Sequence, residues 1–155
     1  MTQYGLQMTQ KLNDFLIASK NTEFATANGT RMHAIMQHIV IDESGDHGDV
    51  DIINIIKSRD DLRPFFATSA QTEVPIAGKI HGQFVSRRID RLLINKTNKT
   101  IDFIDYKTDT NPNEFIDKYR YQLKEYAELL HSAYPDFKIN GYILWLHDWT
   151  LDKII

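Results

Sequence analysis

The sequence predicts a single α/β domain over residues 1–155, in which helices flank one mixed sheet. Three observations lead to this expectation. The chain has 155 residues, of which 42% are apolar, and this length suits one compact core. Helical patterns fill most of residues 1–70, whereas residues 73–107 are dense in β-branched residues with period-2 alternation. A long helical pattern and a short apolar run follow, so the expected order is helices, three strands, a helix and a strand.

The first 70 residues contain three helical patterns. Apolar residues at helical spacing predict a helix over residues 11–20. The cluster Asn28-Gly29-Thr30 is typical of a turn, and its threonine can cap a second helix over residues 31–40. Residues 51–66 predict one or two short helices, with a break before Pro64 because the residue before a proline disfavours helical geometry.

The middle of the chain predicts a three-stranded antiparallel meander. The strands are expected at residues 73–80, 83–94 and 100–107. His81-Gly82 is suited to a tight hairpin turn, because glycine accepts a positive φ. Residues 95–99 predict a second, looser turn.

The last third predicts one helix and one strand. Residues 114–131 carry apolar side chains on neighbouring turns of one side, and this is the strongest helical pattern in the chain. Pro135 ends that helix. The nearly continuous apolar run within residues 138–149 is typical of a buried central strand.

The composition excludes several functional classes. The chain has no cysteine, which rules out disulfides, thiolate zinc sites, Cys-ligated iron–sulfur clusters and cysteine nucleophiles. No run approaches the about 18 apolar residues that span a bilayer, so we expect no membrane partner. The lack of cysteine fits a reducing setting, so we expect a cytoplasmic location. The net charge of -3 argues against a protein that coats nucleic acid by bulk positive charge, so any such role requires a local site.

A basic segment coincides with the predicted meander. Between residues 79 and 107, seven basic residues accompany only three acidic ones. Such a segment can hold a phosphate backbone, and Arg87, Arg88 and Arg91 are the candidate DNA-binding residues. A solvated face of the sheet explains the same charges equally well.

Charged residues also interrupt two apolar strands of the meander. In the third strand, alternation places Asp105 and Lys107 on the same face as Ile101 and Phe103. Asp90 lies in the preceding strand among apolar residues. Buried charges are costly unless they pair or bind a metal ion. The pattern therefore predicts either a metal site or a structural ion pair between Lys107 and one of the two aspartates.

The order of short motifs along the chain is more specific than any one of them. GTxxH comes first, followed by RIDRL, IDYKTD, QxxxY and a final YILWL strand. This order resembles the RecB-family branch of the PD-(D/E)xK nucleases. It is most similar to the C-terminal nuclease domain of AddA-type, UvrD-like helicase–nucleases. The resemblance covers about residues 29–146 and implies a restriction-endonuclease-like αβββαβ core, here with extra N-terminal helices.

The resemblance also assigns the site. It implies metal coordination by His33, Asp90, Asp105 and the main-chain carbonyl of Tyr106. The catalytic residues it implies are Asp90, Asp105, Lys107, Gln122 and Tyr126. Carboxylates, an imidazole and a carbonyl form a hard, oxygen-rich site, which suits Mg²⁺ or Mn²⁺ better than zinc.

The expected function is therefore that of a Mg²⁺-dependent deoxyribonuclease. The resemblance implies exonucleolytic cleavage of single-stranded DNA ends during double-strand-break processing and recombinational repair. The chain lacks a G-x-x-x-x-G-K-[ST] motif, so a helicase motor must be supplied by a partner subunit or by a larger chain from which this domain is excised. Two alternatives stay open: a catalytically silent module that binds DNA or a partner, and a stand-alone phage or restriction-like exonuclease.

Overall fold

The computed structural model describes residues 26–155, so the helix predicted over residues 11–20 lies outside the described part. Residues 33–155 form one compact unit that contains the sheet and the candidate site. Residues 26–37 are helical. The later elements are α2 (Val50–Lys57), α3 (Arg63–Phe66), β1 (Gln71–Ile80), β2 (Gln83–Asn95), β3 (Thr100–Lys107), α4 (Pro112–Ala133), β4 (Lys138–Trp145) and β5 (Thr150–Lys153).

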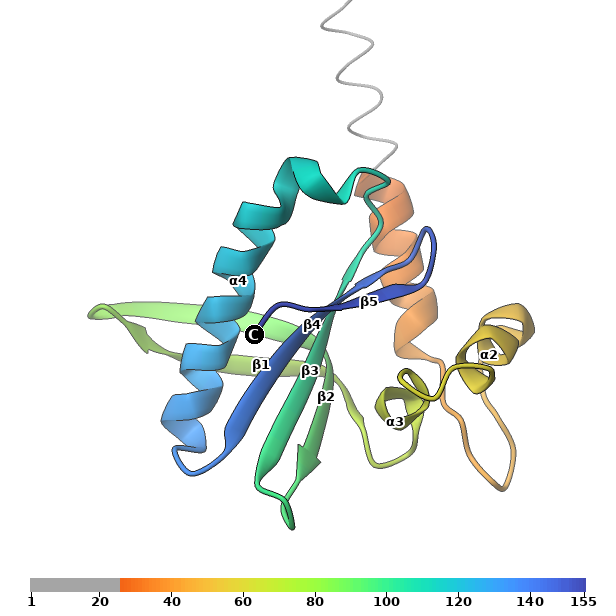
Figure 1. Cartoon of the computed structure of the whole chain (residues 1–155), viewed down its shortest axis with the longest axis horizontal. Helices are drawn as coiled ribbons and strands as arrows, with labels where there is room; N and C mark the ends of the chain where they lie inside the picture. Colours follow the sequence, from red (N-terminus) through yellow and green to blue (C-terminus); the bar gives the residue numbers. More distant parts are fainter. Residues whose placement is uncertain (1–25) are drawn as a thin grey trace, which may run out of the picture. The chain divides into compact units, whose positions relative to one another are not determined.

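The five strands form one mixed sheet in the order β1-β2-β3-β4-β5. β1, β2 and β3 are an antiparallel meander, β3 and β4 are parallel, and β5 returns antiparallel to β4. α4 makes the crossover between the two parallel strands and packs against the sheet (Figure 1). The predicted α/β class and the order of strands and helix are thus confirmed.

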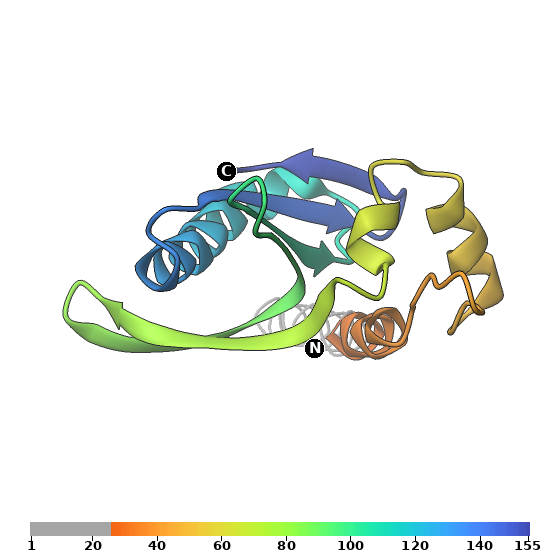
Figure 2. The same ribbon diagram turned by 90° about the horizontal axis from the view of Figure 1, so that it is seen from below.

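The hairpin between β1 and β2 extends beyond the rest of the sheet (Figure 2). Its turn is the predicted one, since His81 and Gly82 both have positive φ, at 49° and 80°. Two consecutive positive φ values match the twist of the flanking strands in a two-residue hairpin. Phe84 lies next to this turn and is 72% exposed.

One local prediction was wrong. Residues 28–30 are helical rather than a turn, and Thr30 does not cap the helix, because its hydroxyl donates to the carbonyl oxygen of Thr26 one turn earlier. The buried strand predicted within residues 138–149 is present as β4, which ends at Trp145. Asp148 Oδ1 accepts from Thr150 N at 3.0 Å and closes a turn, from which β5 begins.

The core lies between α4 and the sheet. Leu123, Tyr126 and Leu130 of α4 pack against buried residues of β2, β3 and β4. Gly141 of β4 pairs with Phe103, and a Cβ at this position would lie 2.6 Å from the phenylalanine ring. Close contact of the two strands beside the ring therefore requires glycine.

No helix within residues 26–155 is long and apolar enough to cross a membrane.

Candidate active site

The end of β3 carries a buried carboxylate beside an ammonium group. Strand alternation places Asp105 and Lys107 on the face that α4 covers, as the sequence predicts, since Ile101 and Phe103 of the same face belong to the core. Asp105 is only 4% exposed. Its Oδ2 lies 2.7 Å from Lys107 Nζ.

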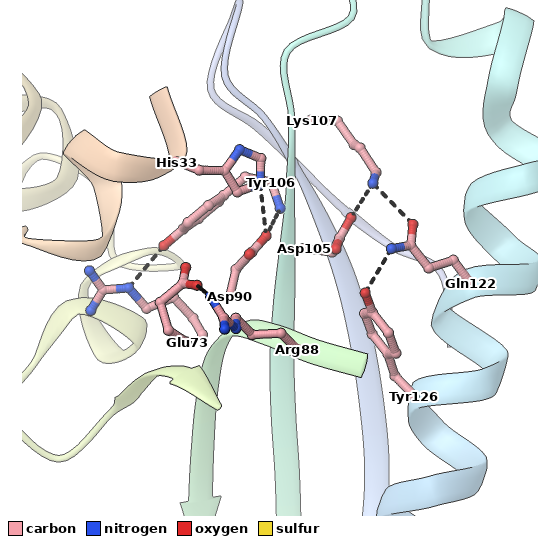
Figure 3. Close-up of polar contacts among 10 residues, drawn as sticks. His33, Glu73, Arg88, Asp90, Asp105, Tyr106, Lys107, Gln122 and Tyr126 are labelled. Carbon is pink, nitrogen blue, oxygen red and sulfur yellow. Dashed lines mark hydrogen bonds and ion pairs between the residues drawn. The ribbon is translucent and has the colours of Figure 1, made fainter. Parts of the chain in front are cut away.

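Lys107 is held from the other side by α4. Its Nζ donates to Gln122 Oε1 at 3.0 Å, and Gln122 Nε2 donates to Tyr126 Oη at 2.7 Å (Figure 3). Gln122 and Tyr126 are one helical turn apart and point toward the end of β3 (Figure 3). Tyr119 covers the ammonium, with Nζ 4.2 Å from its ring centroid. The structure thus brings together four of the predicted catalytic residues: Asp105, Lys107, Gln122 and Tyr126.

Asp90 is positioned by a local break in the sheet. The β2–β3 ladder ends at the Arg91–Ile104 pair, and the β1–β2 ladder skips Asp90. In place of a backbone partner, Tyr106 N donates to Asp90 Oδ2 at 2.7 Å. The same carboxylate oxygen lies 3.3 Å from His33 Nε2, so the histidine predicted from the N-terminal half does reach the site (Figure 3).

Tyr106 links these groups through its main chain and its ring. Lys107 O accepts from Leu146 N of the chain after β4, whereas Tyr106 N points to β2. Since the N–H and C=O of one strand residue point the same way, the Tyr106 carbonyl is directed to the β2 side, where Asp90 lies. The Tyr106 ring contacts His33 edge-on, with centroids 5.6 Å apart.

The environment of Asp105 disfavours the ionised form of its carboxyl group. Burial raises the pKa of Asp105 to about 6; the Lys107 ammonium opposes this shift, and the nearby Asp90 carboxylate adds to it. Asp105 Oδ2 is buried and forms an ion pair with Lys107 Nζ, although within residues 26–155 no donor meets it with the angles of a hydrogen bond. The Lys107 ammonium thus supplies the positive charge that stabilises this buried carboxylate.

The donor set fits a magnesium ion rather than a closed metal cage. Within the described residues, no three His, Asp or Glu side chains lie close enough together to form a metal-binding group. Mg²⁺ commonly uses one or two carboxylates and keeps several waters. Asp90, Asp105 and the Tyr106 carbonyl would supply such oxygen atoms, and the burial of two carboxylates that influence each other's charge is the observation that favours a cation here.

The three arginines predicted to bind DNA differ in their exposure and in their partners. Arg87 Nη2 pairs with Glu125 of α4 at 2.9 Å, and Arg88 Nη1 pairs with Glu73 at 3.3 Å, while both arginine side chains keep substantial exposure. Arg91 is only 1% exposed. It is therefore not placed to contact a DNA backbone, and the expectation for this residue needs correction.

Arg91 instead links the elements around the site through buried hydrogen bonds. Its Nη2 donates to the carbonyl oxygens of Met36 and Ile39, and its Nε donates to Tyr106 Oη at 2.9 Å. Its guanidinium also stacks on the Phe66 ring at 4.4 Å. The carbonyls it binds lie at and just beyond the end of the helix that carries His33, so Arg91 joins this helix to β3.

Two further residues, Tyr119 and Glu73, lie near the site. Tyr119 lies one turn before Gln122, so helical spacing from the QxxxY motif would have found it. Glu73 lies opposite Asp90 where the β1–β2 ladder is interrupted, and it adopts a φ of 52°. No sequence signal indicates that strained backbone, because positive φ is unusual for glutamate.

No protein-family model matches this sequence, and no curated protein matches it significantly.

Proposed function

We propose that this chain is a Mg²⁺- or Mn²⁺-dependent deoxyribonuclease with a restriction-endonuclease-like core. It hydrolyses phosphodiester bonds, acting as an exonuclease on single-stranded DNA ends. The observation that carries the proposal is the arrangement at the end of β3, where the buried carboxylate of Asp105 feels the charge of a second buried carboxylate, Asp90, and pairs with an ammonium group that α4 holds in place.

Asp90 and Asp105 would hold the metal ion, with the Tyr106 carbonyl and His33 completing the protein ligands. When bound, the ion offsets phosphate charge and makes a nearby water more acidic. Burial of both carboxylates strengthens their interaction with a divalent cation, because charge interactions are stronger away from bulk water.

Lys107 would stabilise charge that grows on the phosphate oxygens and orient the attacking water. Gln122 accepts a hydrogen bond from its ammonium and is itself held by Tyr126, and the Tyr119 ring packs against the ammonium. A lysine fixed in this way needs little rearrangement during the reaction, which is the property that electrostatic catalysis requires.

We further propose that a helicase, in the same chain or in a partner subunit, delivers the DNA ends during double-strand-break processing in the cytoplasm. The exposed sides of Arg87 and Arg88 support contact with a phosphate backbone, since both lie on the strand that carries Asp90.

A second candidate is a catalytically silent module that binds DNA or a partner. Two observations favour it: the described residues contain no group of three metal-ligating side chains, and Lys107 pairs with Asp105. In that case the carboxylate and the ammonium form a structural ion pair.

The deciding experiment measures release of nucleotides from end-labelled single-stranded DNA with Mg²⁺. Asp105→Asn should lower the rate by at least about 100-fold, while the matched control Asp136→Asn, an exposed aspartate after α4, should leave it unchanged. Calorimetry with Mg²⁺ accompanies the assay. An intact fold without metal binding or cleavage would establish the silent module, and cleavage that persists in Asp105→Asn would refute the role of this carboxylate.

A further inference from the structure

A recess lined by charged, amide and tyrosine side chains opens beside Lys107. It has a volume of about 440 Å³ and lies between the sheet and α4. Arg87 and Lys107 line it from the sheet, and five residues of α4 line it from the helix. The catalytic ammonium group is therefore shared between the candidate active site and this recess.

The helical residues of the recess form one continuous stripe. Lys118, Tyr121, Gln122 and Glu125 follow the spacing i, i+3, i+4 and i+7, so their side chains emerge on one face of α4. Gln122, inside the stripe, points to Lys107 (Figure 3). Lys118 and Tyr121 precede it on the same face of the helix.

The chemistry of this wall combines positive charge with an exposed aromatic ring. Tyr121 is 66% exposed, so its ring is accessible to a ligand. Within the described residues, Lys118 forms no ion pair. The one carboxylate of the recess, Glu125, is neutralised by Arg87, whose Nε and Nη2 lie 3.0 and 2.9 Å from Oε2.

We propose that this recess binds one nucleotide of a single DNA strand adjacent to the bond that is cut. The base stacks on Tyr121, and the backbone phosphate lies against Lys118. Stacking requires an unpaired base, since duplex bases are covered on both faces by their neighbours, so the recess selects single strands. This inference rests on the proposed function, because Lys107 belongs to both sites.

The test measures binding of fluorescent oligothymidylate by anisotropy in the presence of EDTA, so that neither metal nor cleavage enters the result. Tyr121→Ala should weaken binding by at least about fivefold, whereas Tyr121→Phe should retain it because the ring remains. An oligonucleotide of abasic residues should bind wild type and Tyr121→Ala equally. Phe84→Ala, which removes an exposed ring at the distant hairpin turn, is the matched control and should not change binding.

The phosphate contact is tested by salt dependence. Lys118→Gln should reduce the slope of log K against log salt by about 0.7, the value for one phosphate of a single strand. Lys124→Gln changes an exposed lysine of α4 outside the recess and should leave the slope unchanged.

The outcomes separate this proposal from the nuclease proposal. The stacking site is refuted if Tyr121→Ala binds oligothymidylate as tightly as wild type. It is also refuted if replacing oligothymidylate by the abasic strand weakens binding to wild type and to Tyr121→Ala by the same factor. Both results count even where Mg²⁺-dependent cleavage is present. Failure of wild type to bind the single strand refutes it as well. If binding follows Tyr121 and Lys118 while no cleavage occurs with Mg²⁺, the recess stands and the nuclease proposal fails.

Discussion

Two polar clusters on β3 each contain an aspartate and a lysine, but they differ in hydrogen bonding. Asp102 and Asp105 lie on opposite faces of the strand, and each is linked to a lysine. Asp102 Oδ1 accepts from Asn140 Nδ2 at 2.7 Å, and Asn140 Oδ1 accepts from Lys153 Nζ at 3.0 Å. Asp105 instead is buried and keeps an oxygen without a hydrogen bond within the described residues.

The difference separates a structural cluster from a candidate functional one. Every link of the Asp102 cluster has normal hydrogen-bond geometry, so nothing further is needed to stabilise it. The Asp105 cluster places a buried carboxylate near a second carboxylate, and burial raises the pKa of Asp105 although Lys107 supplies one positive charge. Two buried carboxylates near one ammonium can accept a further cation, which the Asp102 cluster does not need.

The largest expected effect distinguishes the two lysines. Lys107→Met should lower the rate of single-strand cleavage by about 100-fold or more, because the ammonium near the reacting phosphate is lost. Lys153→Met removes the lysine of the structural cluster and should change the rate by less than about twofold. Rates are measured under single-turnover conditions, with circular dichroism to check the fold. Equal losses in both variants would contradict the contrast drawn between the clusters.

Arg91 extends the comparison to stability. Arg91→Met should lower the free energy of unfolding by about 3 kcal/mol, because the carbonyls of Met36 and Ile39 and the Tyr106 hydroxyl lose their shared donor. Arg87→Met, on an exposed pair, should cost less than about 1 kcal/mol. Urea unfolding followed by fluorescence measures both. Similar stabilities for the two variants would refute the structural role of Arg91.

In the metal-free protein, the unfavourable ionisation of buried Asp105 should make the free energy of unfolding depend on pH. Because burial raises the pKa of Asp105 from 3.8 to about 6, the folded state keeps the proton at a pH where the unfolded state has lost it. The contribution of this group is thus fully present below about pH 4 and is lost as pH rises through about 6, a change on the order of 3 kcal/mol.

Asp105→Asn isolates this term, since asparagine does not titrate. The difference in unfolding free energy, wild type minus variant, should fall as pH rises from 4 to 7 in EDTA. Addition of Mg²⁺ at pH 7.5 should stabilise wild type but not the variant. A difference that stays constant with pH in EDTA would show that Asp105 ionises as an ordinary carboxylate.

The sequence could predict those parts of the site that depend on local periodicity. Period 2 placed Asp105 and Lys107 on one face of β3, and period 3.6 placed Gln122 and Tyr126 on one side of α4. The meander and its hairpin turn followed from the same local rules, together with the φ preference of Gly82.

Features that depend on long-range packing could not be predicted in this way. Arg91 has the local pattern of a surface arginine, and only the carbonyls of Met36 and Ile39, more than 50 residues away, make its burial favourable. The strained backbone of Glu73 depends on the interrupted ladders around Asp90. Thr30 was misread because its hydroxyl can bond the preceding turn as readily as it caps a helix.

The smallest expected effect concerns Gln122, whose place in the site is indirect. Gln122 accepts from Lys107 and donates to Tyr126, so it orients the ammonium without contacting the reacting phosphate. Gln122→Ala should lower kcat by about tenfold or less and leave Mg²⁺ affinity unchanged, whereas Gln122→Glu keeps an acceptor for Lys107 and should retain more activity. Single-turnover rates and Mg²⁺ titrations separate these outcomes. If Gln122→Ala lowers kcat as much as Lys107→Met does, Gln122 contacts the substrate itself. The residues that act on the substrate would then include a side chain of α4 as well as those of β3.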